Sequence, residues 1–282
     1  MIMKKTIKKF SLSSCFINFG LIFLLVFALF PIVWTIYTSF RVEMDIIKNP
    51  TGLNFSELNF NAYREVWTGT DFPVLIKNSL ITSFLTMVMS LTLGTLAGYS
   101  LSRSDFRAKE TVLLVYLLVR VIPGVLLLIP IFLLMQKFNL LDTHIGLALA
   151  YTTFTLPAAV WLMKGFFDGL PIDLENAARV DGCSRMGALW RVVLPLVLPG
   201  IAATATLVAI EAWNDVLFAL MITSSTDART WPVGMKLLIG EFQLPWGQLT
   251  ATAVLSLIPV VIGFSFAGRR MVAGLTAGGV KE

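Results

Sequence analysis

Charged residues are scarce in this chain of 282 residues: Asp, Glu, Lys and Arg make up 14% of it, against about 25% in soluble domains. Histidine occurs once, as His144, and cysteine twice, as Cys15 and Cys183. The sequence contains no zinc-binding spacing, no glycine-rich phosphate loop and no nucleophile elbow. We therefore expect no catalytic residue, no metal site and no cofactor in this chain.

Hydrophobic residues are abundant instead, at 56%, and they lie in runs of about 20, the length that a helix needs to cross about 30 Å of hydrocarbon. Inside such a layer every backbone N–H and C=O has to be paired within the protein, so these runs predict membrane-spanning helices. Pro123, Pro130 and Pro157 interrupt the third and fourth runs, but membrane helices tolerate proline. The predicted fold is all-α, one polytopic membrane domain of residues 1–282 with about six transmembrane helices. The predicted spans are 17–40, 75–101, 111–135, 146–163, 196–223 and 249–267.

Lysine and arginine predict the orientation, because cytoplasmic loops of membrane proteins carry an excess of them. Six spans place both termini on one side of the membrane, and fourteen of the 22 Lys and Arg residues fall on that side against seven on the other. We therefore expect both termini to be cytoplasmic. The net charge of +5 follows from this topology and, because no single face or loop concentrates it, does not indicate a nucleic-acid partner.

The conspicuous inner connection, residues 164–195 between the fourth and fifth spans, has the features of a docking helix. Pro171 suits the first position of a helix, Gly182 suits a left-handed helix stop, and a second helical stretch is expected from Arg185 to about Leu194. Small residues recur at helical spacing between Pro171 and Gly182 and form a flat face. The residues of this face are Leu174, Ala177, Ala178 and Asp181. Such a face fits a partner's groove, although the pattern alone also allows a helix that lies on lipid headgroups.

The same loop resembles the EAA loop of binding-protein-dependent ABC permeases, in which Glu-Ala-Ala is followed by three residues, Gly, nine residues and Ile-x-Leu-Pro. The matching positions are Ala177, Ala178, Gly182, Leu194 and Pro195, with Val192 in place of the isoleucine. One position departs from the motif: Asn176 replaces the glutamate and Glu175 lies one residue earlier, so the sequence does not decide which of them has its role. The resemblance implies a coupling helix whose contacts with an ATPase come from Glu175, Asn176, Ala177, Ala178, Asp181 and Gly182.

Two further segments resemble carbohydrate permeases. Trp213-Asn214-Asp215 in the fifth span is similar to their Trp-Asn-acid element. Residues 274–281, within the predicted tail 272–282, resemble the tail of the maltose permease subunit that inserts between two ATPases, and a glycine-rich backbone can enter a narrow space without side-chain clashes. The contact residues implied for this tail are Gly274, Leu275, Thr276, Gly278 and Gly279.

The resemblance implies a permease subunit of an ABC importer, which forms half of the transmembrane pathway for a sugar or oligosaccharide in the inner membrane of a bacterial cell. Its implied partners are a second homologous permease, two ATPase subunits that bind ATP and Mg, an extracytoplasmic solute-binding protein and membrane lipid. Closure of the ATPases would drive alternating access. The alternatives are an ABC permease for another solute, such as a polyol, and an ion-driven secondary transporter that uses Glu211 and Asp215 as ion sites.

Arg120 is the one basic residue deep inside a predicted span, about 14 Å from the cytoplasmic end of the third helix at 1.5 Å per residue. An arginine at this depth should face protein or water. Glu211 is the nearer candidate partner and Asp215 the more distant one. Because these acids are four residues apart, we expect them to share a helix face, with one holding Arg120 while the other, with Asn214, meets the pathway. Carbonyls freed by Pro123, or the second permease, are the rival partners of Arg120.

Small residues form a stripe on the second span at Ser90, Gly94 and Gly98. Stripes of this kind let membrane helices approach closely. We expect this one to pack within the chain rather than against the second permease.

Overall fold

The computed structural model describes the backbone of residues 12–240 and 244–279, and the side chains of residues 16–240 and 244–265. The backbone in these ranges is helical with short connections and contains no strand. Its helices are α1 (Leu12–Ser39), α2 (Glu43–Lys48), α3 (Asn61–Gly69), α4 (Phe72–Arg103), α5 (Lys109–Val121), α6 (Gly124–Lys137), α7 (His144–Asp168), α8 (Asp173–Val180), α9 (Arg185–Ala188), the π-helical turn Leu189–Val193, α10 (Leu194–Leu196), α11 (Leu198–Asn214), α12 (Leu217–Ile222), α13 (Trp231–Leu238) and α14 (Trp246–Gly279).

Four helical segments in the described chain are long and apolar enough to cross a membrane unaided: Phe16–Ser39 in α1, all of α4, all of α7, and Trp246–Ser265 in α14. Two bent pairs pass the same test when each is counted as one span. Lys109–Val121 meets Gly124–Lys137 at 99°, and Arg185–Leu196 meets Leu198–Asn214 at 76°. The all-α fold with about six spans is therefore confirmed, with two of the six spans broken.

The breaks alter the predicted third and fifth spans. Ile122 and Pro123 lie between α5 and α6 with non-helical ψ angles of 122° and 125°, and a proline disfavours the helical conformation of the residue before it. The second bend lies at Val197, between α10 and α11 at the start of the predicted fifth span. That span also divides near its other end at Asp215, whose extended backbone separates α11 from α12. Pro157, by contrast, lies inside α7 without ending it, so a proline in a hydrophobic run does not by itself mark a break.

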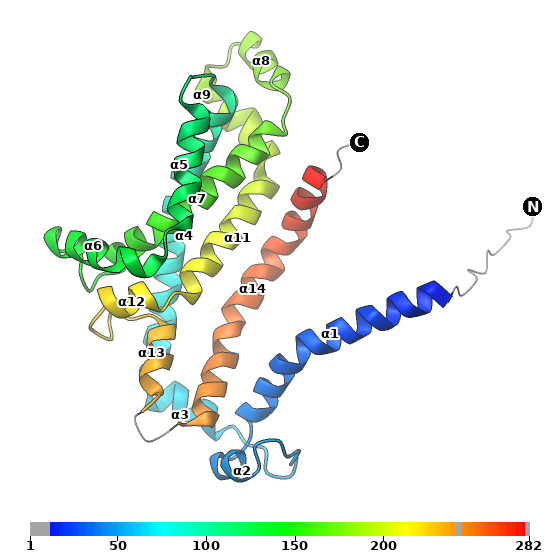
Figure 1. The fold of residues 1–282 in the computed structure, drawn as a ribbon, viewed down its shortest axis with the longest axis vertical. Helices are drawn as coiled ribbons and strands as arrows, with labels where there is room; N and C mark the ends of the chain where they lie inside the picture. Colours follow the sequence, from blue (N-terminus) through cyan, green and yellow to red (C-terminus); the bar gives the residue numbers. More distant parts are fainter. Residues whose placement is uncertain (1–11, 241–243, 280–282) are drawn as a thin grey trace, which may run out of the picture.

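α4 and α7 pack along each other, with α11 beside both and α14 against α11 (Figure 1). Their contact is close because the α4 side of it is small. A Cβ added to Gly94 would lie 2.8 Å from the Cβ of Ala159, and one added to Gly98 would lie 2.8 Å from an α7 backbone nitrogen. The hydroxyls of Ser90 and Thr155 hydrogen-bond at 2.7 Å. The stripe of small residues on α4 therefore packs within the chain, as predicted.

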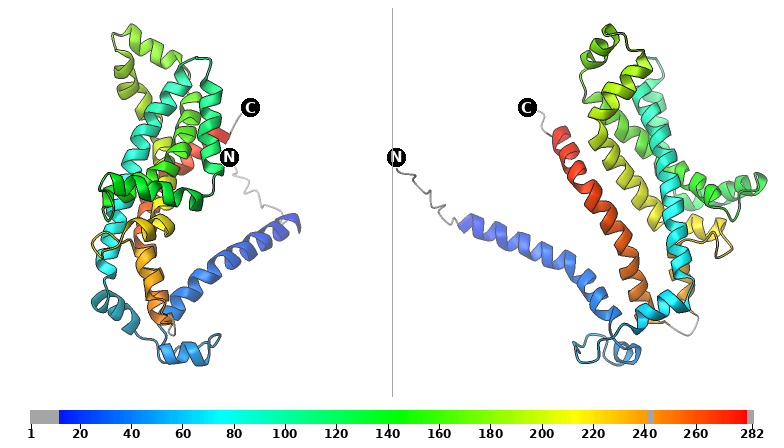
Figure 2. Two further views of the ribbon diagram at one scale, coloured as in Figure 1. Left: turned by 60° about the vertical axis from the view of Figure 1, so that its left-hand side comes forward. Right: turned by 180° about the vertical axis from the view of Figure 1, so that it is seen from behind.

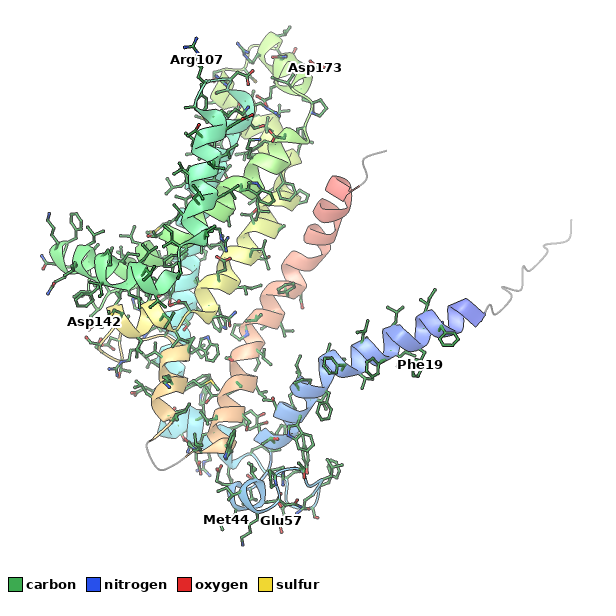
Figure 3. All side chains as sticks on the ribbon, viewed as in Figure 1. Phe19, Met44, Glu57, Arg107, Asp142 and Asp173 are labelled. Carbon is green, nitrogen blue, oxygen red and sulfur yellow. The ribbon has the colours of Figure 1, made fainter. Side chains whose placement is uncertain are left out.

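The bundle has two distinct ends. At one, which we call the α8 end, lie α8, α9, the end of α4 and the start of α5; at the other, the α2 end, lie α2, α3 and the start of α14 (Figures 1 and 2). Figure 3 labels Arg107 and Asp173 at the α8 end and Met44 and Glu57 at the α2 end. Both predicted inner loops, between the second and third spans and between the fourth and fifth, therefore lie at the α8 end.

α1 stands apart from the bundle and joins it only at the α2 end (Figures 1 and 2). None of residues 16–37 is buried. Thr38 and Ser39, at the end of α1, are buried, and the Ser39 hydroxyl lies 2.6 Å from that of Tyr63 in α3. Glu43 strengthens this end, because its carboxylate accepts hydrogen bonds from the first two amides of α14 at 2.9 and 2.8 Å. Carboxylates at a helix N-terminus satisfy amides that have no partner in the helix.

Asp142 connects the α6–α7 loop to the segment after α12. Its Oδ1 accepts hydrogen bonds from the amides of Ser224 at 2.8 Å and Ser225 at 2.9 Å. Desolvation raises the pKa of the Asp142 carboxyl, but these hydrogen bonds more than offset it, and the pKa lies below its ordinary value. The two connections are thus held together most firmly while Asp142 is ionised.

Candidate functional site

The predicted docking helix is present as α8, Asp173–Val180. Its stop is the one that the sequence predicts, since Gly182 has φ +92°. The Gly182 amide donates to the Arg179 carbonyl at 3.1 Å and the Cys183 amide donates to the Ala178 carbonyl at 3.0 Å. This pair of bonds defines the left-handed helix end that glycine favours.

The two faces of α8 have different environments. Glu175 and Ala178, which lie three residues apart on one face, are only 6% and 8% exposed. The remaining residues of α8 are exposed, among them Leu174, Asn176, Ala177 and Val180, and so is Asp181 directly after it. The predicted docking face is therefore divided: Leu174, Ala177 and Asp181 are exposed, whereas Ala178 packs inward with Glu175.

Glu175 is held by the end of α4. Arg103 Nε donates to Glu175 Oε1, and the Tyr99 hydroxyl donates to Oε2 at 2.9 Å. The side chains of Arg103 and Glu175 are 7% and 8% exposed, so the ion pair is enclosed. We call Tyr99, Arg103 and Glu175 the clasp. Of the two candidates for the role of the motif glutamate, Glu175 contacts its own chain and Asn176 is exposed.

The second helical stretch of the loop is present as α9, the π-helical turn and α10. Ser184 begins it as an N-cap, with its hydroxyl accepting a hydrogen bond from the Gly187 amide at 3.1 Å. The π-helical turn precedes Pro195, which has no N–H to continue a regular helix. Leu189 and Val193 are fully buried against α7 residues such as Phe167. This cluster fixes the loop to the bundle.

Arg120 on α5 and Glu211 on α11 form the predicted ion pair, with Nη2 and Oε1 2.8 Å apart. The contact itself is confirmed. Their side chains are 39% and 40% exposed, so the described part of the chain does not enclose the pair. Because a charge inside a bilayer is costly unless it meets protein or water, this surface requires one of the two.

Asp215 does not have the predicted arrangement. α11 ends at Asn214, and Asp215 lies beyond it with Oδ1 accepting hydrogen bonds from the amides of Phe218 at 3.0 Å and Ala219 at 3.2 Å. Glu211 and Asp215 therefore do not share a helix face, and that expectation is wrong because the helix breaks between them. Asp215 caps α12, whereas Asn214 is exposed on the last turn of α11.

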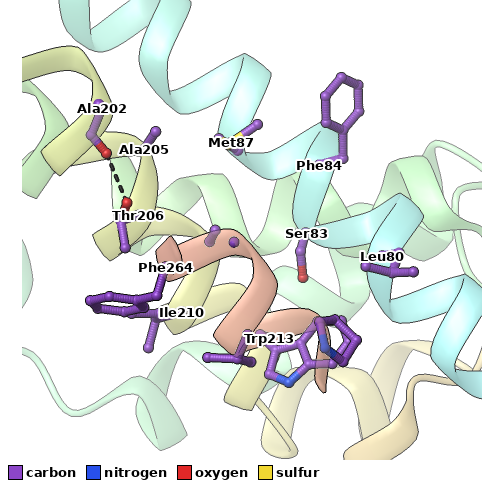
Figure 4. A pocket seen from close by; sticks show the side chains of 14 residues that line it. Leu80, Ser83, Phe84, Met87, Ala202, Ala205, Thr206, Ile210, Trp213 and Phe264 are labelled. Atoms are coloured by element: carbon purple, nitrogen blue, oxygen red, sulfur yellow. Dashed lines mark hydrogen bonds between the residues drawn. The ribbon is translucent and has the colours of Figure 1, made fainter. Parts of the chain in front are cut away.

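A cavity of about 450 Å³ lies between α4, α11 and α14 (Figure 4). Trp213 forms part of its wall and also packs against Trp231, with ring centroids 6.1 Å apart. Thr206 turns its hydroxyl to the Ala202 carbonyl at 2.8 Å, and the Ser83 hydroxyl finds no hydrogen-bond partner among the described residues. The remaining lining is apolar and offers little for recognition of a polar solute. It consists of Leu80, Phe84, Met87, Ala202, Ala205, Ala209, Ile210, Pro259, Val260, Gly263 and Phe264.

Comparison with known proteins agrees with this geometry. Residues 90–275, which include the α8 loop, both ion pairs and the broken spans, match the family described as binding-protein-dependent transport system inner membrane component. The chain belongs to this family. It is a multi-pass membrane protein of the permease type.

The relatives of this permease match along almost its whole length. It is 36% identical to the sulfoquinovosyl glycerol transport system permease protein SmoH of Agrobacterium fabrum, over 92% of this chain and 90% of that one. It is 34% identical to the trehalose/maltose transport system permease protein MalG of Thermococcus litoralis, over 93% and 95%. A chain of a crystallised bacterial ABC transporter involved in alginate import has the same fold, with a TM-score of 0.76 at 23% identity over 92% and 98%.

The predicted tail of the permease lies only partly within the described chain. α14 continues to Gly279, so the backbone of the predicted contact residues is helical. These residues are Gly274, Leu275, Thr276, Gly278 and Gly279. Their side chains and residues 280–282 lie outside the described part, and the contact with ATPases stays a prediction.

The two clasp residues on α4 were not predicted from the sequence, in which Arg103 counts only among the fourteen basic residues of the predicted cytoplasmic side. A signal was nevertheless present: Tyr99 and Arg103 are four residues apart at the end of a span, so they share a helix face. Glu175 supplies the matching acid in the next inner loop.

Proposed function

We propose that this chain is a permease subunit of an ABC importer for a sugar or oligosaccharide, in the inner membrane of a bacterial cell. The family match supports the transport role. The solute class is supported by the relatives, whose names include transport of sulfoquinovosyl glycerol, trehalose/maltose and arabinooligosaccharides. The chain provides half of a pathway and has no catalytic role of its own.

The observation that carries the proposal is α8. This helix lies at one end of the bundle, is locked to α4 by an enclosed ion pair and leaves Asn176, Ala177 and Val180 exposed. An ion-driven secondary transporter has no ATPase to contact and needs no such helix. The exposed face of α8 is the surface that an ATPase would cover, with the α8 end and both termini on the cytoplasmic side.

The remaining partners follow from this orientation. Two ATPases would bind ATP and Mg and contact α8 and the 272–282 tail, while a solute-binding protein would meet the α2 end. The exposed α1 does not by itself require a protein partner, because lipid is as apolar as its side chains. The half-exposed Arg120–Glu211 pair does require protein or water. A second permease, with the pathway between the two subunits, provides both.

The working cycle is a shift between two packings of the spans. When ATP binding closes the ATPases, the docked α8 moves with them and the spans rock from an inward-facing to an outward-facing arrangement. The interruption of the fifth span at Asp215 supports a pathway near this point, because discontinuous helices line solute sites in other transporters.

Copurification tests this proposal. The tagged chain, expressed in its own host and extracted in detergent, should retain an ATPase whose hydrolysis rises when sugar-loaded binding protein is added. A chain truncated after residue 273 should insert normally and retain less ATPase. Purification of the wild-type chain without an ATPase would contradict the proposal, and stimulation by polyols rather than sugars would favour the alternative solute.

A further inference from the structure

The clasp fixes the direction of α8 as well as its distance from α4. Tyr99 and Arg103 lie one turn apart on α4 and reach the two oxygens of the same carboxylate, the hydroxyl at 2.9 Å from Oε2 and the guanidinium at Oε1. A carboxylate held at both oxygens cannot rotate freely, and charge-assisted bonds of this kind are among the stronger ones in proteins. Glu175 is therefore oriented toward its own chain and away from the exposed face of α8.

Arg103 also ties α4 to the end of α7. Its Nη2 donates to the Leu170 carbonyl at 3.1 Å, in the turn between α7 and α8, and its Nη1 lies 3.2 Å from the Ser102 hydroxyl. The Ser102 hydroxyl donates in turn to Asp168 Oδ1 at 2.6 Å, at the last residue of α7. One arginine thus joins three elements: α4, the α7–α8 turn and α8.

We infer that Glu175 is a positioning residue for transport, which transmits the movement of α8 to α4 through the clasp and does not contact the ATPase. Asn176, on the exposed face, makes that contact. The inference rests on the proposed function, because only a bound ATPase supplies the movement. α4 packs on α7 so closely that Gly94 and Gly98 have no room for a side chain, so a pull on Arg103 moves both spans together.

Substitutions in the clasp and substitutions on the exposed face of α8 should have different effects. Removing either charge of the clasp leaves the other enclosed without a partner, which loosens the attachment of α8. A loosened α8 still presents Asn176, Ala177 and Val180 to an ATPase, but its movement is no longer passed to α4. A change at Asn176 has the opposite effect, because it alters the contact and leaves the clasp intact.

The experiment compares two quantities in the assembled transporter: the ATPase retained per permease chain, and the sugar transported per ATP hydrolysed. Glu175→Gln and Arg103→Met should retain the ATPase while transport per ATP falls by about five-fold or more. The double variant should be no worse than either single one, because both act through one contact. Asn176→Ala should lower ATPase retention instead. Arg107→Met, at an exposed arginine four residues after Arg103, is the matched control and should change neither quantity.

If the charge variants fail to accumulate, Tyr99→Phe tests the clasp in their place. It removes only one hydroxyl and should cause a smaller loss of transport per ATP with full ATPase retention. Amide hydrogen exchange over residues 173–180 gives a readout that needs no transport, and exchange should be faster in both Tyr99→Phe and Glu175→Gln than in the wild type.

Three results would overturn the inference. Glu175→Gln that loses the ATPase while transport per ATP stays normal would make Glu175 a contact residue. A double variant with additive losses would show that Arg103 and Glu175 act separately, and unchanged exchange in α8 would show that the clasp does not hold it. A wild-type chain that retains no ATPase is a different outcome, which rejects the proposed function itself and this inference with it.

Discussion

Two ion pairs between different helices have different surroundings in this permease. Arg103–Glu175 is enclosed, with each side chain less than a tenth exposed, whereas Arg120–Glu211 leaves about two fifths of each side chain exposed. Breaking an enclosed pair by removing one partner typically costs about 3–5 kcal/mol, because the remaining charge stays buried. The cost of breaking the more exposed pair, Arg120–Glu211, depends on what covers it in the membrane. Its effect should therefore appear in assembly and transport rather than in the stability of the isolated chain.

A double-mutant cycle tests the Arg120–Glu211 pair. Arg120→Leu and Glu211→Leu should each impair assembly or uptake, because each leaves one charge in the membrane without its partner. The double variant should recover part of the loss, since it removes both charges. Uptake rates and the yield of assembled complex give the measurement. Losses that simply add would mean that the two residues do not act as a pair.

The contact of Arg120 with Glu211 could be predicted because depth in a membrane follows from position along a helix at 1.5 Å per residue. The role of Asp215 could not be predicted in the same way. Its position relative to Glu211 depends on the helix ending at Asn214, and no glycine or proline marks that end. The choice between Glu175 and Asn176 for the role of the motif glutamate was open for a similar reason. Only the orientation of α8 on the bundle decides which face of α8 is buried.

At the scale of elements, the end of α8 depends on the backbone of Gly182. Its φ of +92° is costly for residues with a Cβ, by about 1–2 kcal/mol. No atom lies within 4 Å of the position that a Cβ would take, so the cost within this chain is conformational rather than steric.

Gly182→Val should therefore reduce sugar uptake more than Gly182→Asn, because asparagine adopts left-handed conformations more readily. Equal losses in the two variants would contradict the backbone argument. They would indicate that an added side chain collides with a bound partner.

The α4–α7 contact gives a second prediction for an element. Gly98→Ala places a Cβ against the α7 backbone and should destabilise the chain by about 1–3 kcal/mol, as overpacking usually does. Gly165→Ala in α7 is the matched control, because nothing lies within 4 Å of its Cβ position and alanine favours helix. Thermal unfolding in detergent should show a lower midpoint for Gly98→Ala only. Equal midpoints would mean that the two helices do not pack this closely.

Proline shows why element boundaries were harder to predict than their number. Pro123 separates two helices that meet at 99°, whereas Pro130, Pro157 and Pro259 lie inside helices. The residue type is the same in each case, so proline by itself does not decide where a helix breaks. The lengths of the hydrophobic runs correctly predicted about six spans, because the thickness of the bilayer sets the length of a spanning helix. The bends depend on packing, which no local pattern records.

At the scale of the whole molecule, the two ends of the bundle are built differently. The α8 end combines the clasp, the exposed face of α8 and the nearby basic inner loops, while the α2 end attaches α1 and caps α14 through Glu43. This division suits a protein that receives movement at one end and solute at the other. The sequence predicted the division because basic residues mark one side of a membrane protein, and the motif loop falls on that side.

Uptake into sealed vesicles tests the central claim most directly. The chain would be reconstituted with the proposed second permease and ATPases, with ATP enclosed on the ATPase side and sugar-loaded binding protein on the other. We predict that sugar accumulates only when ATP is enclosed, and that ionophores which abolish proton and sodium gradients leave the rate unchanged. Uptake that proceeds without ATP and stops when the ion gradients are abolished would contradict the account, because it would identify an ion-driven transporter.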